Sequence, residues 1–224
     1  MERRNISKSN TQLQQDVLSE LKYEPSVDAS NIGITAKDGI VGLNGNVHSY
    51  AEKYAAVRAA ERVAGVEAVT DEMNVDLPAF HVRNDEDIAR AVVNALQWDV
   101  WVPQDRIKAK VDGGWVTLDG KVDYKYQQDA AENAVRNLTG VKGVTNLVSI
   151  NKPAVIPSEI KANIDFALRR AAEVDADNIK VKVVDDKVIL NGKVSSWAER
   201  GEAERAAWSA PGVREVEDDL VIMA

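Results

Sequence analysis

The pattern of apolar and polar positions repeats three times along this chain of 224 residues. The clearest part of the repeat is a strand-like Leu-x-Gly-x-Val segment. This segment occurs at residues 43–47, 118–122 and 190–194. A Gly-Val pair follows each segment, and the two glycines are 20 residues apart in all three copies. Identical spacing at three places predicts three structurally equivalent units.

Each unit opens with apolar residues four positions apart, a spacing that places them on one face of a helix of about three turns. These residues are Leu13, Val17 and Leu21, then Ile88, Val92 and Leu96, then Ile160, Ile164 and Leu168. Alternating apolar residues then predict a half-buried strand, and a tight turn leads into the Leu-x-Gly-x-Val strand. An alanine-rich helix follows, which we expect to end at the glycine of the Gly-Val pair. A final alternating segment predicts the third strand.

We therefore predict an α+β fold of three tandem αββαβ units. Each unit is a three-stranded mixed sheet with two helices packed on one face. The units are expected at residues 11–77, 85–150 and 158–224. Residues 1–10 are predicted to be a disordered arm, and the proline-containing segments 78–84 and 151–157 are predicted to be semi-rigid spacers.

Six recurring glycines mark equivalent positions in the three units. They are Gly45, Gly120 and Gly192 in the strands, and Gly65, Gly140 and Gly212 at the helix ends. A strand glycine usually marks a bulge or a close approach of the backbone, so a structural role is favoured, with ligand contact as the alternative.

Composition excludes several classes of function. The chain has no cysteine and two histidines, which excludes disulfide scaffolds and Cys/His zinc sites. The formal net charge is −8 and no unit has a basic balance, so nucleic-acid binding is disfavoured. The same charge opposes simple electrostatic adsorption to anionic membranes. We predict no metal site and no cofactor.

The sequence also indicates where the protein works and that it is not an enzyme. No run of apolar residues is long enough to cross a membrane, and no apolar segment follows the charged amino terminus. We therefore expect a soluble cytoplasmic protein. The chain has no Gly-x-Ser-x-Gly elbow, phosphate loop or paired-histidine motif, so we predict that it is not an enzyme.

The Leu-x-Gly-x-Val strand, the alanine-rich helix, the Gly-Val pair and the valine-rich closing strand together resemble the BON domain family. The resemblance covers nearly the whole chain. It implies an αββαβ fold without catalytic activity, and a role in binding membrane phospholipid that is linked to osmotic stress and envelope integrity. Relatives in the family are often periplasmic, and some are associated with potassium.

Two tryptophans, Trp98 and Trp101, lie at the end of the first helix of the second unit. They are candidates for contact with lipid headgroups or with a partner protein. The alternative is that Trp101 packs on the sheet edge and Trp98 lies across the linker. The residues equivalent to Trp98 are Tyr23 and Arg170, which are amphipathic, so this position is expected at the surface.

Lysines alternate with the buried residues of the first strand in two of the units. They are Lys108 and Lys110 in the second unit, and Lys180 and Lys182 in the third. We expect them to form a basic stripe on the sheet face opposite the helices. The stripe either contacts an acidic headgroup or protein, or keeps a wet sheet face soluble.

The leading interpretation is a non-catalytic binding module of an osmotic or related stress response. It would associate peripherally with anionic phospholipid or with an envelope-linked partner. The alternatives are a soluble protein-interaction or protective scaffold without lipid affinity, and a potassium-responsive sensor.

Overall fold

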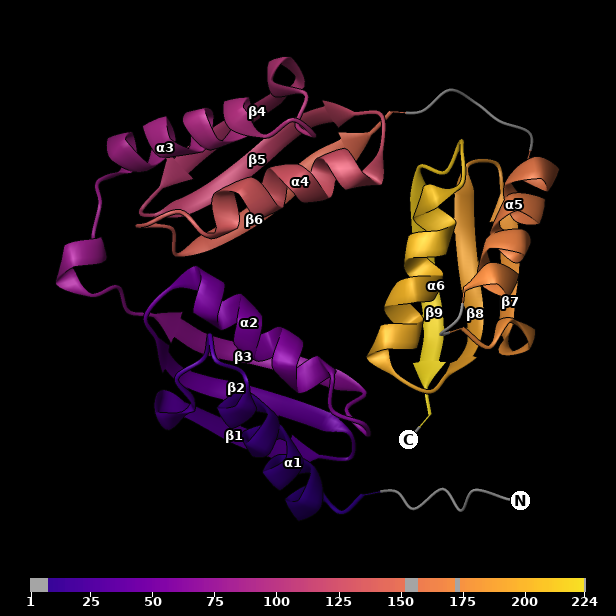
Figure 1. Ribbon diagram of the computed structural model, residues 1–224, viewed down its shortest axis with the longest axis horizontal. Helices are drawn as coiled ribbons and strands as arrows, with labels where there is room; N and C mark the ends of the chain where they lie inside the picture. Colours follow the sequence, from indigo (N-terminus) through magenta and orange to yellow (C-terminus); the bar gives the residue numbers. More distant parts are fainter. Residues whose placement is uncertain (1–7, 152–156, 172–173, 224) are drawn as a thin grey trace.

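The computed structural model describes residues 8–151, 157–171 and 174–223, and this part of the chain forms three units of the same architecture (Figure 1). The first unit comprises α1 (Asn10–Tyr23), β1 (Ile32–Lys37), β2 (Ile40–Val47), α2 (Tyr50–Glu61) and β3 (Ala68–Val75). The second comprises α3 (Asp85–Trp98), β4 (Ile107–Asp112), β5 (Trp115–Val122), α4 (Lys125–Arg136) and β6 (Gly143–Ile150). The third comprises α5 (Pro157–Arg170), β7 (Ile179–Val184), β8 (Lys187–Val194), α6 (Trp197–Ser209) and β9 (Glu215–Ile222). The predicted α+β fold is confirmed.

The three sheets are mixed, with the strand orders β1-β2-β3, β4-β5-β6 and β7-β8-β9. The central strand of each sheet pairs antiparallel with the strand before it and parallel with the strand after it. A two-residue turn joins the antiparallel strands, with Asp38 and Asp185 in the left-handed region at φ 49° and 56°. The parallel pair needs a crossover, which α2, α4 and α6 provide.

Each unit has its own core between the sheet and its two helices. The first helix contributes the predicted apolar stripe; in α1, for example, Leu13, Val17 and Leu21 are buried. The second helix contributes small residues such as Ala59 and Ala60, which are fully buried. Small side chains bring the helix backbone close to the sheet and leave its opposite face free for other contacts.

Parts of the predicted termini and linkers can be placed. Ser9 caps the amino end of α1, and its hydroxyl accepts a hydrogen bond from the Gln12 amide at 3.2 Å. The first linker contains the short 3₁₀ helix η2 (Ala79–His81), and η1 (Ala29–Asn31), η3 (Gln104–Arg106) and η4 (Ala176–Asn178) precede the first strand of each unit. Residues 1–7 of the predicted arm and 152–156 of the second predicted spacer lie outside the described residues.

The three units are arranged around a centre that α2, α4 and α6 face (Figure 1). The first residue of each of these helices reaches the next unit. These residues, which are equivalent in the repeat, are Tyr50, Lys125 and Trp197. Tyr50 packs against the core of the second unit and hydrogen-bonds the backbone of Val144. Burial there raises the pKa of Tyr50, and the negative charge of Glu132 raises it further.

The other two contacts continue in the same direction around the ring. The ammonium of Lys125 in the second unit lies 5.8 Å from the centre of the Trp208 ring in the third. The indole N–H of Trp197 in the third unit donates to the carbonyl of Val66 in the first at 2.8 Å. The Trp197 contact joins residues 131 positions apart in the sequence. The three units therefore form a closed head-to-tail ring within one chain.

Candidate functional site

One end of the second unit exposes a group of large apolar side chains. Trp98, the last residue of α3, is 88% exposed, and Val100 and Trp101 in the following loop are 87% and 61% exposed. The ring of Trp101 lies edge-on to that of Tyr126 at 5.5 Å, and Tyr126 stacks on Tyr124 at 5.5 Å. We call these five residues the aromatic end.

The sequence indicated the two tryptophans of the aromatic end but not its two tyrosines. Trp98 and Trp101 were candidates for surface contact, and both are exposed; Trp101 packs on a residue of α4. Tyr124 and Tyr126 were missed. A signal was present, because Tyr124 occupies the helix-capping position that serine holds in the other units, as Ser49 and Ser196.

The four candidate lysines are exposed on the open faces of their sheets, in two different units. In the second unit, Lys108 lies opposite Asp119 in the strand register, and the ammonium of Lys110 is 3.7 Å from the Asp112 carboxylate. In the third unit, Lys180 and Lys182 lie opposite the uncharged Asn191 and Ile189. Directly opposed residues lie on the same face of a sheet. Neighbouring acidic side chains therefore offset the positive charge of the lysines on β4 more than that of the lysines on β7.

The far edge of the third sheet is acidic. Lys187 on β8 bonds both Glu215 and Glu217 of β9, each at 2.7 Å. The hydrogen bonds from Glu215 and then Glu217 hold the pKa of Lys187 well above its usual range. The open face of this sheet therefore runs from a basic edge at β7 to an acidic edge at β9.

The recurring strand glycines meet a backbone carbonyl. A Cβ on Gly45, Gly120 or Gly192 would lie 2.1, 2.1 and 2.0 Å from the carbonyl oxygen of the residue preceding the first strand. All three have positive φ, at 115°, 151° and 143°. Gly65, Gly140 and Gly212 also have positive φ, at 94°, 94° and 90°. The prediction that they end the helices is wrong, because α2, α4 and α6 end at Glu61, Arg136 and Ser209 and these glycines lie in the turn that follows. At each position glycine allows a backbone conformation that residues with a side chain rarely adopt.

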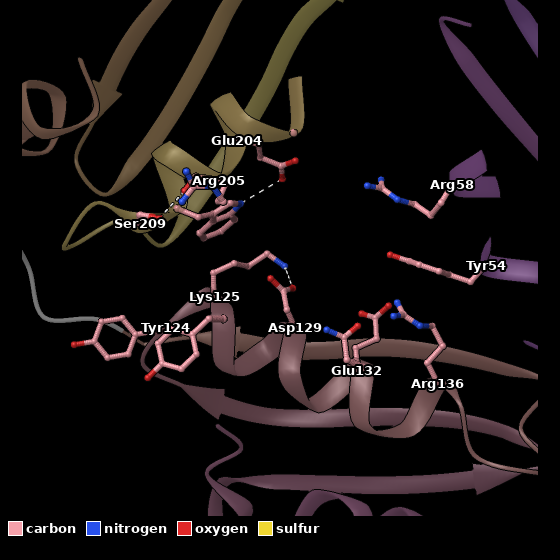
Figure 2. A pocket seen from close by; sticks show the side chains of 14 residues that line it. Tyr54, Arg58, Tyr124, Lys125, Asp129, Glu132, Arg136, Glu204, Arg205 and Ser209 are labelled. Carbon is pink, nitrogen blue, oxygen red and sulfur yellow. Dashed lines mark hydrogen bonds and ion pairs between the residues drawn. The ribbon is translucent and has the colours of Figure 1, made fainter. Parts of the chain in front are cut away.

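A cavity of about 710 Å³ lies at the centre of the ring, between α2, α4 and α6 (Figure 2). Its lining mixes aromatic and charged side chains from all three units. Among these are Tyr54 and Arg58 from α2, Asp129 and Arg136 from α4, and Glu204 and Trp208 from α6. Nothing in the sequence pattern indicated this cavity. Its residues occupy the helix face opposite the alanines, where a single unit would show an ordinary solvent-exposed surface.

Within the described residues no cluster of three or more His, Asp or Glu side chains is placed to hold a metal ion. Every buried side-chain nitrogen or oxygen in the described part of the chain has a hydrogen-bond partner. No helix within these same residues combines the length and the apolarity that a membrane span requires.

A family model described as "BON domain" matches residues 9–76, 84–152 and 158–224. The chain belongs to the BON domain family. Each of the three units described above is thus one BON unit, and the resemblance inferred from the sequence is confirmed.

A curated relative of this three-unit BON protein is "Osmotically-inducible protein Y" of Escherichia coli (strain K12), with 31% identity over 125 residues. The match covers 54% of this chain and 62% of the relative, so the chain spans less than two thirds of that protein's length. Solved structures of CdsD, a structural protein of the type III secretion system of Chlamydia trachomatis, also match. One covers 93% of this chain and 90% of the CdsD chain at 16% identity and a TM-score of 0.26. The other, its C-terminal domain, covers 97% and 100% at 15% identity and a TM-score of 0.28. Similarity that low carries no argument.

Proposed function

We propose that this BON protein is a non-catalytic binding protein of an osmotic or related stress response, and that it associates peripherally with anionic phospholipid. Membership of the BON family and the similarity to an osmotically inducible relative support the stress role. The aromatic end is the observation that supports lipid contact.

The exposure of Trp98, Val100 and Trp101 has an energetic cost in water that contact with a membrane interface removes. Tryptophan and tyrosine are enriched at membrane–water interfaces, because one end of the side chain is apolar and the other hydrogen-bonds. The net charge of −8 opposes long-range attraction to an anionic surface. Attachment therefore needs both insertion of the aromatic end and attraction of the anionic headgroups to exposed lysines such as Lys180 and Lys182.

Co-sedimentation with vesicles tests this proposal. We expect the protein to bind vesicles of phosphatidylglycerol and phosphatidylcholine at low salt, more weakly at moderate salt, and not to bind pure phosphatidylcholine. Replacing Trp98 and Trp101 together with alanine should reduce binding at least about tenfold, since each buried tryptophan contributes on the order of 2 kcal/mol.

Tyr23→Ala is the matched control, because Tyr23 is the equivalent of Trp98 in the first unit and is 83% exposed. Its vesicle binding should be unchanged, and circular dichroism should show both variants folded. If the double tryptophan variant sediments with vesicles as well as the wild type does, the aromatic end is not the membrane contact.

A second candidate is a protein-interaction scaffold without lipid affinity. The net charge of −8 favours it, because this charge repels an anionic membrane but not a basic protein surface. The same sedimentation assay separates the two candidates. Failure to bind vesicles of either composition at either salt concentration would reject lipid binding and direct the search to a partner pull-down.

A further inference from the structure

The central cavity concentrates basic side chains on an otherwise acidic molecule. The chain as a whole has a net charge of −8, whereas the cavity is lined by four basic and three acidic side chains. The basic ones are Arg58, Lys125, Arg136 and Arg205; the acidic ones are Asp129, Glu132 and Glu204. The distribution of partners among these seven decides which hydrogen-bond donors are available to a ligand.

Each lining carboxylate already has a donor from the protein. Asp129 is paired with Lys125 one helical turn earlier, which neutralises both groups. Glu204 accepts the indole N–H of Trp208 at 3.3 Å. Glu132 accepts the side-chain amide of Asn146 at 3.2 Å.

The arginines that line the cavity differ in their hydrogen-bond partners. Arg205 makes two hydrogen bonds to Glu202 on its own helix. Arg136 is different: among the described residues it has no carboxylate partner, and its guanidinium lies 3.8 Å from the centre of the Tyr54 ring in the neighbouring unit. Stacking on a ring uses the face of a guanidinium and leaves its N–H groups directed outward along the edge.

Arg58 lies one helical turn after Tyr54 on α2 and extends into the cavity on the same side (Figure 2). Among the described residues it bonds only Glu61, on its own helix, at 2.9 Å, and its side chain is 59% exposed. Arg58 and Arg136, from different units, thus flank Tyr54 on one wall of the cavity (Figure 2), and both retain N–H donors that no carboxylate in the described part of the chain occupies.

We propose that Arg58 and Arg136 bind the phosphate or carboxylate group of a small organic anion in this cavity. Paired guanidiniums bind planar or tetrahedral oxyanions through parallel charge-assisted hydrogen bonds. The volume of about 710 Å³ lies within the range of small-molecule sites, so the anionic group is one end of a larger ligand. Tyr124 and Tyr126 of the aromatic end also line this cavity, but Arg58 and Arg136 do not belong to the aromatic end, so the proposal does not rest on the membrane contact of Trp98.

Calorimetric titration of the full chain with inorganic phosphate and with glycerol 3-phosphate, at constant ionic strength, tests the site. We expect saturable binding of both at one site per chain, with glycerol 3-phosphate tighter. Arg58→Gln and Arg136→Gln should each weaken binding by about tenfold, because each removes charge-assisted hydrogen bonds. Arg58→Gln leaves the contact of Arg136 with Tyr54 intact, so its effect reports ligand contact and not loss of the junction between units.

Arg90→Gln is the matched control. Arg90 is an exposed arginine of α3 paired with Glu86 and Asp87, and it is not part of the cavity lining. Absence of saturable binding by the wild-type protein, or an equal loss in the Arg90→Gln variant, would overturn the proposal. Phosphatidylglycerol vesicles identify the source of the anion. If Arg58→Gln also weakens vesicle binding, the ligand is a lipid headgroup; if it weakens only the soluble titrations, the ligand is a free metabolite.

Discussion

At the scale of single residues, Glu199 shows how a buried carboxylate fixes the start of a helix. One of its oxygens accepts the Asp175 amide at 2.8 Å, and the other accepts the amide and hydroxyl of Ser195, each at 2.7 Å. Burial raises the pKa of Glu199, but the amides of Ser195 and Asp175 and the Ser195 hydroxyl outweigh it and hold that pKa below its ordinary value of 4.5. The equivalent residues are Glu52, which makes the same two backbone contacts, and Gln127, whose uncharged amide oxygen accepts the amides of Asp123 and Tyr124 at the start of α4.

We expect α6 to lose stability as the pH falls, because Glu199 becomes protonated. A lowered folded-state pKa means that the stabilisation is complete above about pH 4.5 and is lost as the pH falls through the lowered value. Glu199→Gln should reduce the protection of α6 by about 1–3 kcal/mol at neutral pH, and the difference from wild type should shrink in acid. Hydrogen exchange of α6 amides, corrected for intrinsic rates at each pH, measures this. Helix α4, anchored by Gln127, is the internal control, and a difference that persists in acid would contradict the prediction.

At the scale of secondary-structure elements, β4 and β7 carry equivalent lysine pairs in unequal surroundings. Lys108 and Lys110 have acidic neighbours on the same face, whereas Lys180 and Lys182 face uncharged residues on β8. Only uncompensated charges contribute strongly to attraction for an anionic surface, and salt screens that attraction.

Replacing Lys180 and Lys182 with glutamine should therefore weaken binding to phosphatidylglycerol vesicles more than the same replacement of Lys108 and Lys110. The expected loss is about 1 kcal/mol per lysine near the surface at low salt, and less at moderate salt. Vesicle titrations of the two double variants at both salt concentrations compare matched changes in charge. Equal losses of vesicle affinity would mean that the neighbouring acidic side chains do not determine how much each lysine pair contributes to binding.

The elements themselves could be predicted because local sequence determines them. The four-residue spacing of Leu13, Val17 and Leu21 defines a helix face, and the 20-residue interval between Gly45 and Gly65 spans the end of a strand, a helix and a turn. The aromatic end was predicted in part, because Trp98 and Trp101 are close in sequence and unusual in type. The tyrosines of α4 join them only through the fold of the unit.

At the scale of the whole molecule, the ring could not be predicted from the repeat. Three chemically different residues, Tyr50, Lys125 and Trp197, make its junctions from one repeat position, so no shared motif marks the interface. Two of the junctions join units that are adjacent in sequence. The third, from Trp197 to Val66, joins the first and last units directly, so it is the contact that distinguishes a closed ring from a string of three units.

Trp197→Ala should therefore open the ring while leaving each unit folded. The substitution removes the indole N–H that bonds Val66 and the ring that Arg200 covers at 5.0 Å. Small-angle X-ray scattering should show a larger radius of gyration and maximum dimension, since the hydrogen bond between the first and third units is lost. The affinity for inorganic phosphate proposed for Arg58 and Arg136 should change little, because the contact between Tyr54 and Arg136 still holds α2 and α4 together.

Trp115→Ala is the matched control for ring opening. Trp115 lies on the outer face of the second sheet, where its indole N–H bonds Thr145 at 2.8 Å within the same unit. Its loss removes a side chain of the same size without touching a junction, so the scattering profile should keep the dimensions of the wild type. If Trp197→Ala and Trp115→Ala scatter alike, the Trp197 contact does not hold the ring closed. If only Trp197→Ala expands, one hydrogen-bonded indole determines whether three BON units act as separate modules or as one body around a shared cavity.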